Sequence, residues 1–266
     1  PWGTDVLGRD MLSLVLAGAQ QTLSLAALVV LARMVIGFVL GALSGWFNGS
    51  WLDRAIQSVA EVIAAAGHID VLVNNAGILR DRSFKKMTLS DWDLVLQVHL
   101  SGTAYVTRAA WPHMNEQGYG RIVLTSSSSG IYGNFGQANY GAAKMGMLGL
   151  MNVLALEGAK NNVRVNTLAP AAATRMISTI PGRDIDPDSP PPESAPKLVS
   201  PAVLFMTSDE APTGAVINAG GGRYYRAQIF VNDPIDLGVE ASFEDLMANT
   251  ESLMDMSQAK PKTGGV

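Results

Sequence analysis

The sequence contains no cysteine and only three histidines. Without cysteine the chain has no disulfide framework, thiol nucleophile or cysteine metal site, and nothing in it demands an oxidising compartment. His68, His99 and His113 are spread along the chain without the spacing of metal ligands. These absences favour a cytoplasmic protein that holds no structural metal.

Charge is also sparse. Charged residues make up 16% of the 266 residues, and the net charge is −4 at pH 7. The chain therefore has no general electrostatic reason to bind nucleic acid or an anionic membrane surface. Hydrophobic residues make up 48%, which is enough to fill the core of one large α/β domain or two small ones.

The longest apolar stretch runs from Leu23 to Phe47 and is interrupted by Arg33. It is long enough to span a bilayer, and Gly37, Gly41 and Gly45 form a row of small residues that would let another helix approach closely. The stretch predicts either a membrane contact through residues 23–47 or a helix buried in a soluble core.

Residues 1–60 also carry a family resemblance. They are similar to the inner-membrane permease subunit of dipeptide and oligopeptide ABC transporters, on the motifs Gly3-Thr4-Asp5, Leu7-Gly8-Arg9-Asp10-Met11-Leu12-Ser13 and Gly45-Trp46-Phe47-Asn48-Gly49. Such a subunit needs several spans and a coupling loop, which nothing after Ala66 supplies. A working transporter is therefore excluded.

From Gly67 onward, short β-rich runs alternate with amphipathic helical stretches, which indicates βαβ units and a parallel sheet. Thr88 and Asp91 predict a capping box at the start of the first long helix. We expect strands at Ile69–Val73, Arg121–Thr125, Val163–Ala169 and finally Ala215–Asn218, helices at Leu89 to about Glu116 and Asn139 to about Lys160, a mobile loop at Pro181–Pro196, and a disordered tail at Gln258–Val266.

The most informative motif is Tyr140-Gly141-Ala142-Ala143-Lys144, which on a helix places a phenol and an ammonium one turn apart on one face. A phenol with a pKa of about 10 needs help to act as a general base at neutral pH. A cation at about 4 Å contributes about 4 kcal/mol at an effective dielectric of about 20, enough to lower that pKa by about three units. The motif predicts a general acid/base, with a solvated helix face as the alternative.

Polar and small residues follow three consecutive predicted strands. Asn74-Asn75-Ala76-Gly77 follows the first, Ser127 lies in a serine run after the second, and Asn166, Pro170 and Thr174 lie at the end of the third. Ligands of open α/β sheets bind at the carboxyl ends of the strands. Three strand ends therefore point to one crevice, although plain turns use the same residue types.

In their order and spacing, these motifs resemble the short-chain dehydrogenase/reductase family over about Gly67 to Gly222. Two runs, Gly77-Ile78-Leu79-Arg80-Asp81-Arg82-Ser83-Phe84 and Gly130 to Tyr140, are similar to the (3R)-hydroxyacyl-CoA dehydrogenase unit of peroxisomal multifunctional enzymes. The resemblance implies an NAD- or NADP-dependent oxidoreductase that acts on a secondary alcohol or ketone, including acyl-CoA substrates.

The same resemblance implies residue roles. Tyr140 would be the general acid/base, Lys144 would lower the pKa of Tyr140 and hold the nicotinamide ribose, and Ser127 would bind the substrate oxygen. The cofactor would be held by Asn75, Ala76, Gly77, Tyr140, Lys144, Pro170 and Thr174. His99 stands where many relatives have asparagine, and it is interpreted either as a proton relay or as a packed helix histidine, outside the catalytic set.

The fold implied by the resemblance begins with a strand, a glycine-rich turn and a helix that binds the pyrophosphate. No such turn precedes Gly67. We therefore expect an α/β fold with a partial Rossmann-type, doubly wound parallel sheet that lacks its first strands and follows a long apolar helix. The strand Ile69–Val73 would then be an exposed hydrophobic edge.

The predicted organisation has three parts: a permease-like segment at 1–60, a catalytic half at 67–235, and a C-terminal helix and tail at 236–266. We interpret the chain, which starts at Pro1, as a fusion joined between about residues 55 and 67. Three functions follow: an oxidoreductase with weakened cofactor affinity, an inactive chimera or permease fragment, or a pairing module that forms homo-oligomers through the long helices.

Overall fold

The computed structural model describes residues 51–174, 176, 186 and 189–262. The chain divides into two compact units, Pro1–Ala55 and Ile56–Val266, and the second carries the fold described below. The apolar stretch 23–47 and nearly all of the permease-like segment lie outside the described residues. Within the described part of the chain, no helix has both the length and the hydropathy that a membrane crossing requires.

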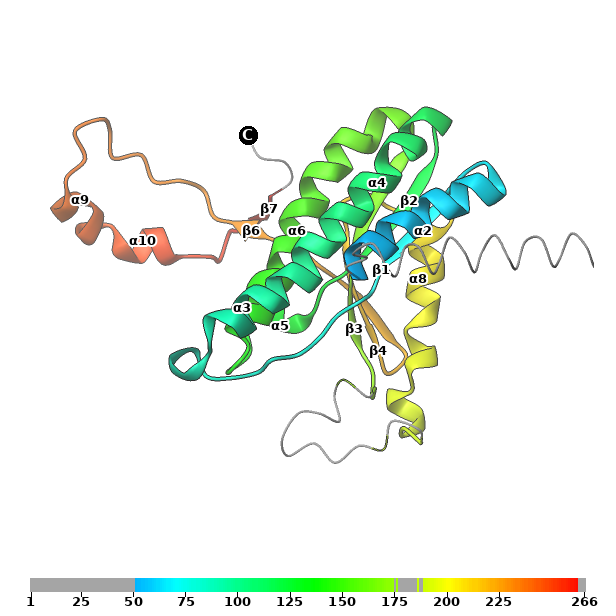
Figure 1. The fold of residues 1–266 in the computed structure, drawn as a ribbon. Coiled ribbons are helices and arrows are strands. Elements are labelled where there is room, and N and C mark those ends of the chain that lie inside the picture. The colour runs from blue at the N-terminus through cyan, green and yellow to red at the C-terminus, as the bar shows by residue number, and fades with distance from the viewer. Residues whose placement is uncertain (1–50, 175, 177–185, 187–188, 263–266) are drawn as a thin grey trace, which may run out of the picture. The chain divides into compact units, whose positions relative to one another are not determined.

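The core of the second unit is a five-stranded sheet in the order β1-β2-β3-β4-β5 (Figure 1). The first four strands are parallel, and β5 is antiparallel to β4. This confirms the prediction of an α/β, Rossmann-like fold with a parallel sheet. The strands are β1 (Val71–Asn74), β2 (Gly120–Thr125), β3 (Val163–Ala171), β4 (Val216–Gly220) and β5 (Arg223–Ala227).

The prediction that the strand at Ala215–Asn218 is the last of the sheet was wrong. Strand β5 follows it after the two-residue loop Gly221-Gly222, in which both residues have positive φ angles. Two left-handed residues in a two-residue loop match the twist of a β-hairpin. The glycine run therefore turns the chain back along β4.

Helices cover both faces of the sheet. Helices α2 (Trp51–Ala66), α4 (Gly102–Gln117) and α6 (Ala138–Gly158) pack on one face, where their apolar side chains meet Ile122 and Leu124. Helix α8 (Ser200–Thr207) packs on the other face against Val123. Alternate residues of β2 thus serve two cores, as the pleat of a strand dictates.

The predicted long helix from Leu89 is observed, but it is not uniform. It consists of α3 (Leu89–Leu96), a π-helical turn η2 (Gln97–Ser101) and α4. The hydroxyl of Thr88 accepts the first-turn N–H of Asp91 at 3.1 Å, which confirms the N-cap half of the predicted capping box. The Asp91 carboxylate accepts from the Thr88 hydroxyl at 2.8 Å instead of from the Thr88 backbone N–H, so the box itself is not formed. The predicted second helix is α6 followed by a short 3₁₀ turn, η3 (Ala159–Asn161).

Strand β1 is one edge of the sheet. Val71 and Val73 are 44% and 42% exposed, as expected for a hydrophobic edge strand. Short elements lie between the main helices and strands: the helix α5 (Ser128–Tyr132) and the 3₁₀ turns η1 (Phe84–Lys86), η4 (Pro192–Ser194) and η5 (Pro196–Leu198).

The expected disorder from Gln258 onward was wrong as far as residue 262. Strand β7 (Lys260–Pro261) pairs with β6 (Phe230–Val231), and Lys260 forms an ion pair with Asp233 at 3.0 Å. Long-range pairing has no local sequence signal, so composition alone missed it. Two short helices, α9 (Phe243–Ala248) and α10 (Thr250–Met254), stand where one C-terminal helix was expected.

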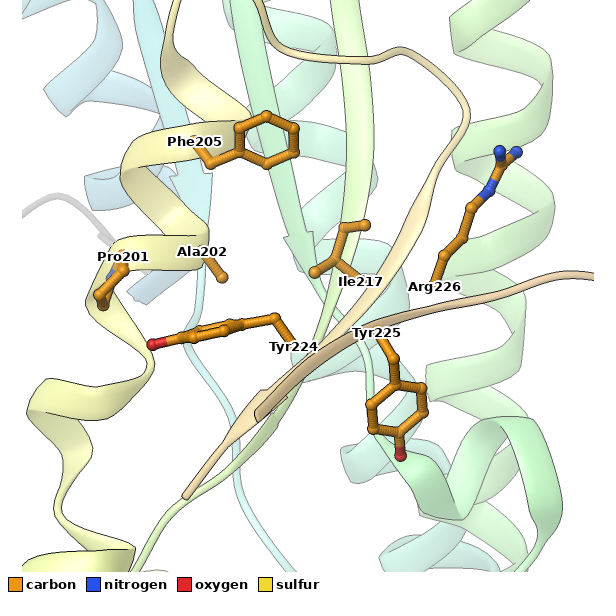
Figure 2. A pocket seen from close by; sticks show the side chains of 7 residues that line it. All are labelled: Pro201, Ala202, Phe205, Ile217, Tyr224, Tyr225 and Arg226. Atoms are coloured by element: carbon orange, nitrogen blue, oxygen red, sulfur yellow. The ribbon is translucent and has the colours of Figure 1, made fainter. Parts of the chain in front are cut away.

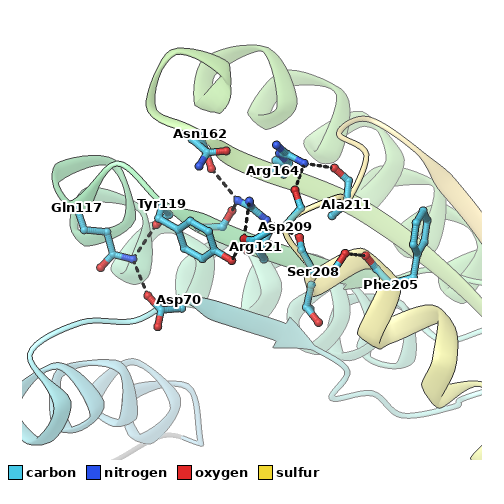
Figure 3. A network of polar contacts seen from close by, with 12 residues as sticks. Asp70, Gln117, Tyr119, Arg121, Asn162, Arg164, Phe205, Ser208, Asp209 and Ala211 are labelled. Carbon is cyan, nitrogen blue, oxygen red and sulfur yellow. Dashed lines mark hydrogen bonds and ion pairs between the residues drawn. The ribbon is translucent and has the colours of Figure 1, made fainter.

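A polar network joins the amino-terminal ends of β2 and β3 to the segment after α8 (Figure 3). Arg121 is buried and donates hydrogen bonds to the carbonyl oxygens of Ser208 and Asn162, both at 2.9 Å. Its guanidinium also lies 4.1 Å from the ring centre of Tyr119. This network lies at the opposite end of the strands from the predicted crevice.

Candidate active site

The start of α6 carries two of the three predicted catalytic residues. Tyr140 and Lys144 lie one turn apart and are only 8% and 2% exposed. Ser127 follows the carboxyl end of β2, and its side chain is hydrogen-bonded to Tyr140. The fold thus brings together three residues that are up to seventeen positions apart in the sequence.

Ser127 stands out from the serine run that made the choice ambiguous. Its side chain caps α5 by accepting the N–H of Ser129 at 3.2 Å. Ser126 is buried, and its hydroxyl donates to the Lys144 carbonyl at 2.7 Å. Ser128 is exposed. Of these serines, Ser127 is the one whose hydroxyl lies next to the phenol.

Lys144 is linked to the end of β1 through one intermediate residue. Its Nζ donates to the Thr125 carbonyl oxygen at 2.5 Å, and the Thr125 hydroxyl donates to Oδ1 of Asn75 at 3.2 Å. Burial lowers the pKa of Lys144 to about 8, because a charged ammonium loses hydration there. The ammonium lies 5.4 Å from the ring centre of Tyr140.

The pKa of Tyr140 is raised above its ordinary value. Burial is the main cause, the negative charge of Asp81 adds to it, and the hydrogen bond from Ser127 opposes it. This direction is opposite to the one that the resemblance implies. In this structure the phenol therefore keeps its proton at neutral pH.

The residues after β1 have two different surroundings. Asn75 and Ala76 are exposed at the end of the strand. Gly77 is packed against His99: a Cβ added to it would overlap Cε1 of His99 and lie 3.0 Å from Nδ1. Gly77 thus has a packing reason to lack a side chain.

The predicted residues of β3 are less closely tied to this group. Pro170 pairs with Ala219 near the end of β3, and both Pro170 and Thr174 are half-buried. Asn166 is buried and holds the loop before β4, donating to Pro212 O at 2.6 Å and accepting from Ala215 N at 3.1 Å. Its role is therefore structural.

Sequence reasoning missed Asn139 and Thr125. Asn139 is fully buried, and its Oδ1 accepts the N–H of Tyr140 at 2.8 Å. Its Nδ2 donates to the carbonyl oxygens of Arg80 and Asp91, each at 3.2 Å. Asn139 lies inside the first turn of α6, whose N-cap is Gln137, so no capping signal marked it. Thr125 had no local signal either, because its hydroxyl acts across strands.

His99, one of whose interpretations was a packed helix histidine, is fully buried beside the catalytic group. Burial lowers its pKa to about 4, the charge of Lys144 lowers it further, and a hydrogen bond with the Ile78 backbone opposes both. The imidazole is therefore neutral at physiological pH. Its ring centre lies 5.1 Å from that of Tyr140, with the two rings perpendicular.

Two hollows lie away from this group. One, of about 400 Å³, lies between α8 and the β4–β5 hairpin and is lined by Phe205, Tyr224 and Arg226 among others (Figure 2). The other, of about 560 Å³, lies on α4 and α6 and is lined by Tyr105, Trp111 and Leu154 among others. Neither contains Ser127, Tyr140 or Lys144.

The donor set fits a nicotinamide dinucleotide. A phenol hydroxyl, an ammonium and a serine hydroxyl converge at the carboxyl edge of a parallel sheet, where dinucleotides bind in open α/β folds. Exposed Asn75 and Ala76 leave backbone accessible at the neighbouring strand end. No group of side chains suited to a metal ion occurs among the residues that the structure describes.

Comparisons with known proteins agree with this geometry. The sequence profile of the short chain dehydrogenase family matches residues 50–181. A short-chain type dehydrogenase/reductase of Mycobacterium tuberculosis is 45% identical over 209 residues, covering 78% of this chain and 71% of the relative. Acetoacetyl-CoA reductase of Shinella zoogloeoides is 40% identical over 181 residues, covering 65% of this chain and 75% of the relative.

Among solved structures, the full-length peroxisomal multifunctional enzyme type 2 of Drosophila melanogaster superposes with a TM-score of 0.65 at 38% identity. The match covers 79% of this chain and 37% of that one. The permease resemblance of residues 1–60 gains no support from these comparisons. The profile match and the extent of the bacterial relatives show that the chain belongs to the short-chain dehydrogenase/reductase family of oxidoreductases.

Proposed function

We propose that this chain catalyses hydride transfer between NAD or NADP and the carbon of a secondary alcohol or ketone, with a 3-hydroxyacyl-CoA or 3-oxoacyl-CoA as substrate. The observation that carries the proposal is the buried group of Ser127, Tyr140 and Lys144 at the carboxyl edge of the sheet. The acyl-CoA class is supported by the name of the acetoacetyl-CoA reductase relative.

In the proposed reduction, Tyr140 donates its phenolic proton to the carbonyl oxygen of the substrate. Its raised pKa suits this role, because the proton is present at neutral pH. Ser127, which bonds the phenol, would hold the same substrate oxygen. The nicotinamide, when bound, supplies the hydride. In the oxidation, Tyr140 would accept the hydroxyl proton instead.

The cofactor site is proposed on the surrounding residues. Lys144 would bind the nicotinamide ribose through its ammonium, and the residues after β1, exposed Asn75 and Ala76 with the half-buried Gly77, would contact the same part of the cofactor. Pro170, near the end of β3, and Thr174, after it, would hold the carboxamide. Support for this assignment comes from the chain of contacts that joins Asn75 to Lys144 through Thr125.

We also propose that two copies associate through the long helices. Tyr105, Val153 and Leu156 are apolar and exposed on α4 and α6, and the larger hollow lies between these helices. Exposed apolar surface of this kind is typical of an association site. Sedimentation at several concentrations tests it, and a monomer throughout the micromolar range would contradict it.

The proposed function is tested by reducing acetoacetyl-CoA with NADH or NADPH and following the nicotinamide absorbance. Tyr140→Phe should lower kcat by about 10²-fold or more, because the proton donor is gone. The matched control is Tyr225→Phe, which removes an exposed phenol on β5 and should leave turnover unchanged. Equal turnover in Tyr140→Phe and wild type would refute the assignment.

A simple ketone without coenzyme A should be a poorer substrate under the same conditions. If the ketone turns over as well as acetoacetyl-CoA, the oxidoreductase assignment stands and the acyl-CoA class fails.

A further inference from the structure

The π-helical turn Gln97–Ser101 places His99 inside the molecule. Such a turn inserts one extra residue in a helix and is frequent at functional sites. His99 is fully buried there, between the segment that follows β1 and the start of α6. A polar ring in this position needs a specific set of partners.

One nitrogen of His99 contacts both backbone groups of one residue. Nε2 lies 3.0 Å from the Ile78 nitrogen and 2.7 Å from the Ile78 oxygen. A neutral imidazole has one N–H, so Nε2 either donates to the oxygen or accepts from the nitrogen. The shorter contact favours donation to the oxygen. Nδ1 is buried and has no hydrogen-bond partner among the described residues.

The imidazole ring is held from two sides. Gly77 lies so close that it has no room for a Cβ beside Cε1. Tyr140 packs against the ring in a perpendicular arrangement, with 5.1 Å between ring centres. Perpendicular aromatic pairs are favourable and directional, contributing about 0.5–1.5 kcal/mol beyond the area that they bury.

We infer that His99 is a positioning residue for Tyr140: its imidazole, seated on Gly77 and bonded to Ile78, holds the phenol ring where the hydroxyl meets Ser127. The catalytic role of Tyr140 in this inference rests on the proposed function, whereas the packing of His99 on Tyr140 is independent of it. On this inference, the π turn orients the imidazole toward the phenol ring.

The contacts argue against proton transfer by His99. Nε2 is engaged by backbone, and Nδ1 faces no proton donor or acceptor among the described residues. The groups that face the ring are Lys144 and Tyr140 from α6 and the Ile78 backbone. Asp81 adds its charge to the surroundings of the phenol.

The inference is tested by NMR of protein labelled at Cζ of tyrosine, with the Tyr140 signal identified by its loss in Tyr140→Phe. In wild type this signal should titrate above the ordinary value of about 10. In His99→Leu the phenol should lose its packing and gain water, so the midpoint should fall by about one pH unit. In His99→Phe, which keeps a ring, the Tyr140 midpoint should fall less.

His99→Asn guards against a leucine variant that does not fold, because asparagine keeps polar contacts to Ile78 but has no ring; its Tyr140 midpoint should also fall. The matched control is His113→Leu, which removes an exposed histidine from α4 and should leave the signal unchanged. A Tyr140 shift and midpoint equal to wild type in folded His99→Leu or His99→Asn would overturn the inference.

Kinetics separate this inference from the proposed function. With acetoacetyl-CoA, His99→Leu should lower kcat at least about tenfold and change KM less than about twofold, because misplacing a catalytic group costs rate while the buried imidazole does not touch substrate. If wild type shows no turnover, the proposed function fails while the NMR result still decides the role of His99.

Discussion

The burial of Lys144 makes a quantitative prediction about stability and pH. Its pKa is about 8 in the folded chain, against about 10.4 in an unfolded one. The unfolded state therefore binds more protons between these two values, and stability rises with pH across that window. At about 1.4 kcal/mol per unit, the buried charge costs about 3 kcal/mol at neutral pH, and most of this cost is relieved by about pH 10.

The assay is urea unfolding of wild type and Lys144→Met at several pH values from about 7.5 to about 10. The methionine keeps an apolar stem and removes the titration, so tyrosine ionisation cancels in the difference. The free energy of unfolding of wild type should rise by about 2 kcal/mol relative to that of the variant over this range. In the control variant Lys85→Met, which removes an exposed lysine, the free energy of unfolding should differ from that of wild type by the same amount at every pH.

A flat difference between wild type and Lys144→Met across this range would refute the reasoning. It would mean that Lys144 is hydrated, and that the packing at the start of α6 does not force the ammonium next to Tyr140.

Three further changes test the packing around the site by urea unfolding. Gly77→Ala should lower the free energy of unfolding by about 1–3 kcal/mol, because the added Cβ collides with the His99 ring. An unchanged free energy of unfolding would show that the ring moves freely. Thr88→Ala should cost about 1 kcal/mol through the lost cap on Asp91 N; no loss would mean the cap is not formed in solution. Arg121→Met should cost about 2–4 kcal/mol because buried carbonyl oxygens lose their donor, and a loss below about 1 kcal/mol would contradict Figure 3.

Much of the site was predictable from the sequence because its signals are local. Tyr140 and Lys144 are one helical turn apart, so the helix alone places them on one face. Strand order placed the serine run after β2 at the crevice, but it did not single out Ser127, whose choice came from the family resemblance.

The rest depends on long-range packing. The raised pKa of Tyr140 results from burial, which the helical spacing of Tyr140 and Lys144 does not encode. The π turn at His99 has no sequence signature in Val98-His99-Leu100, and it forms where Ile78 and Tyr140 can receive the ring. Strand β5 did have a signal, the glycine pair Gly221-Gly222, which the prediction overlooked.

The central claim, that this chain binds a nicotinamide dinucleotide beside Lys144, is tested most directly by calorimetric titration of the full chain with NADH and with NADPH. The account predicts saturable binding of at least one of them, clearly weaker in folded Lys144→Met. No binding of either to a folded chain, even at millimolar concentrations, would contradict it.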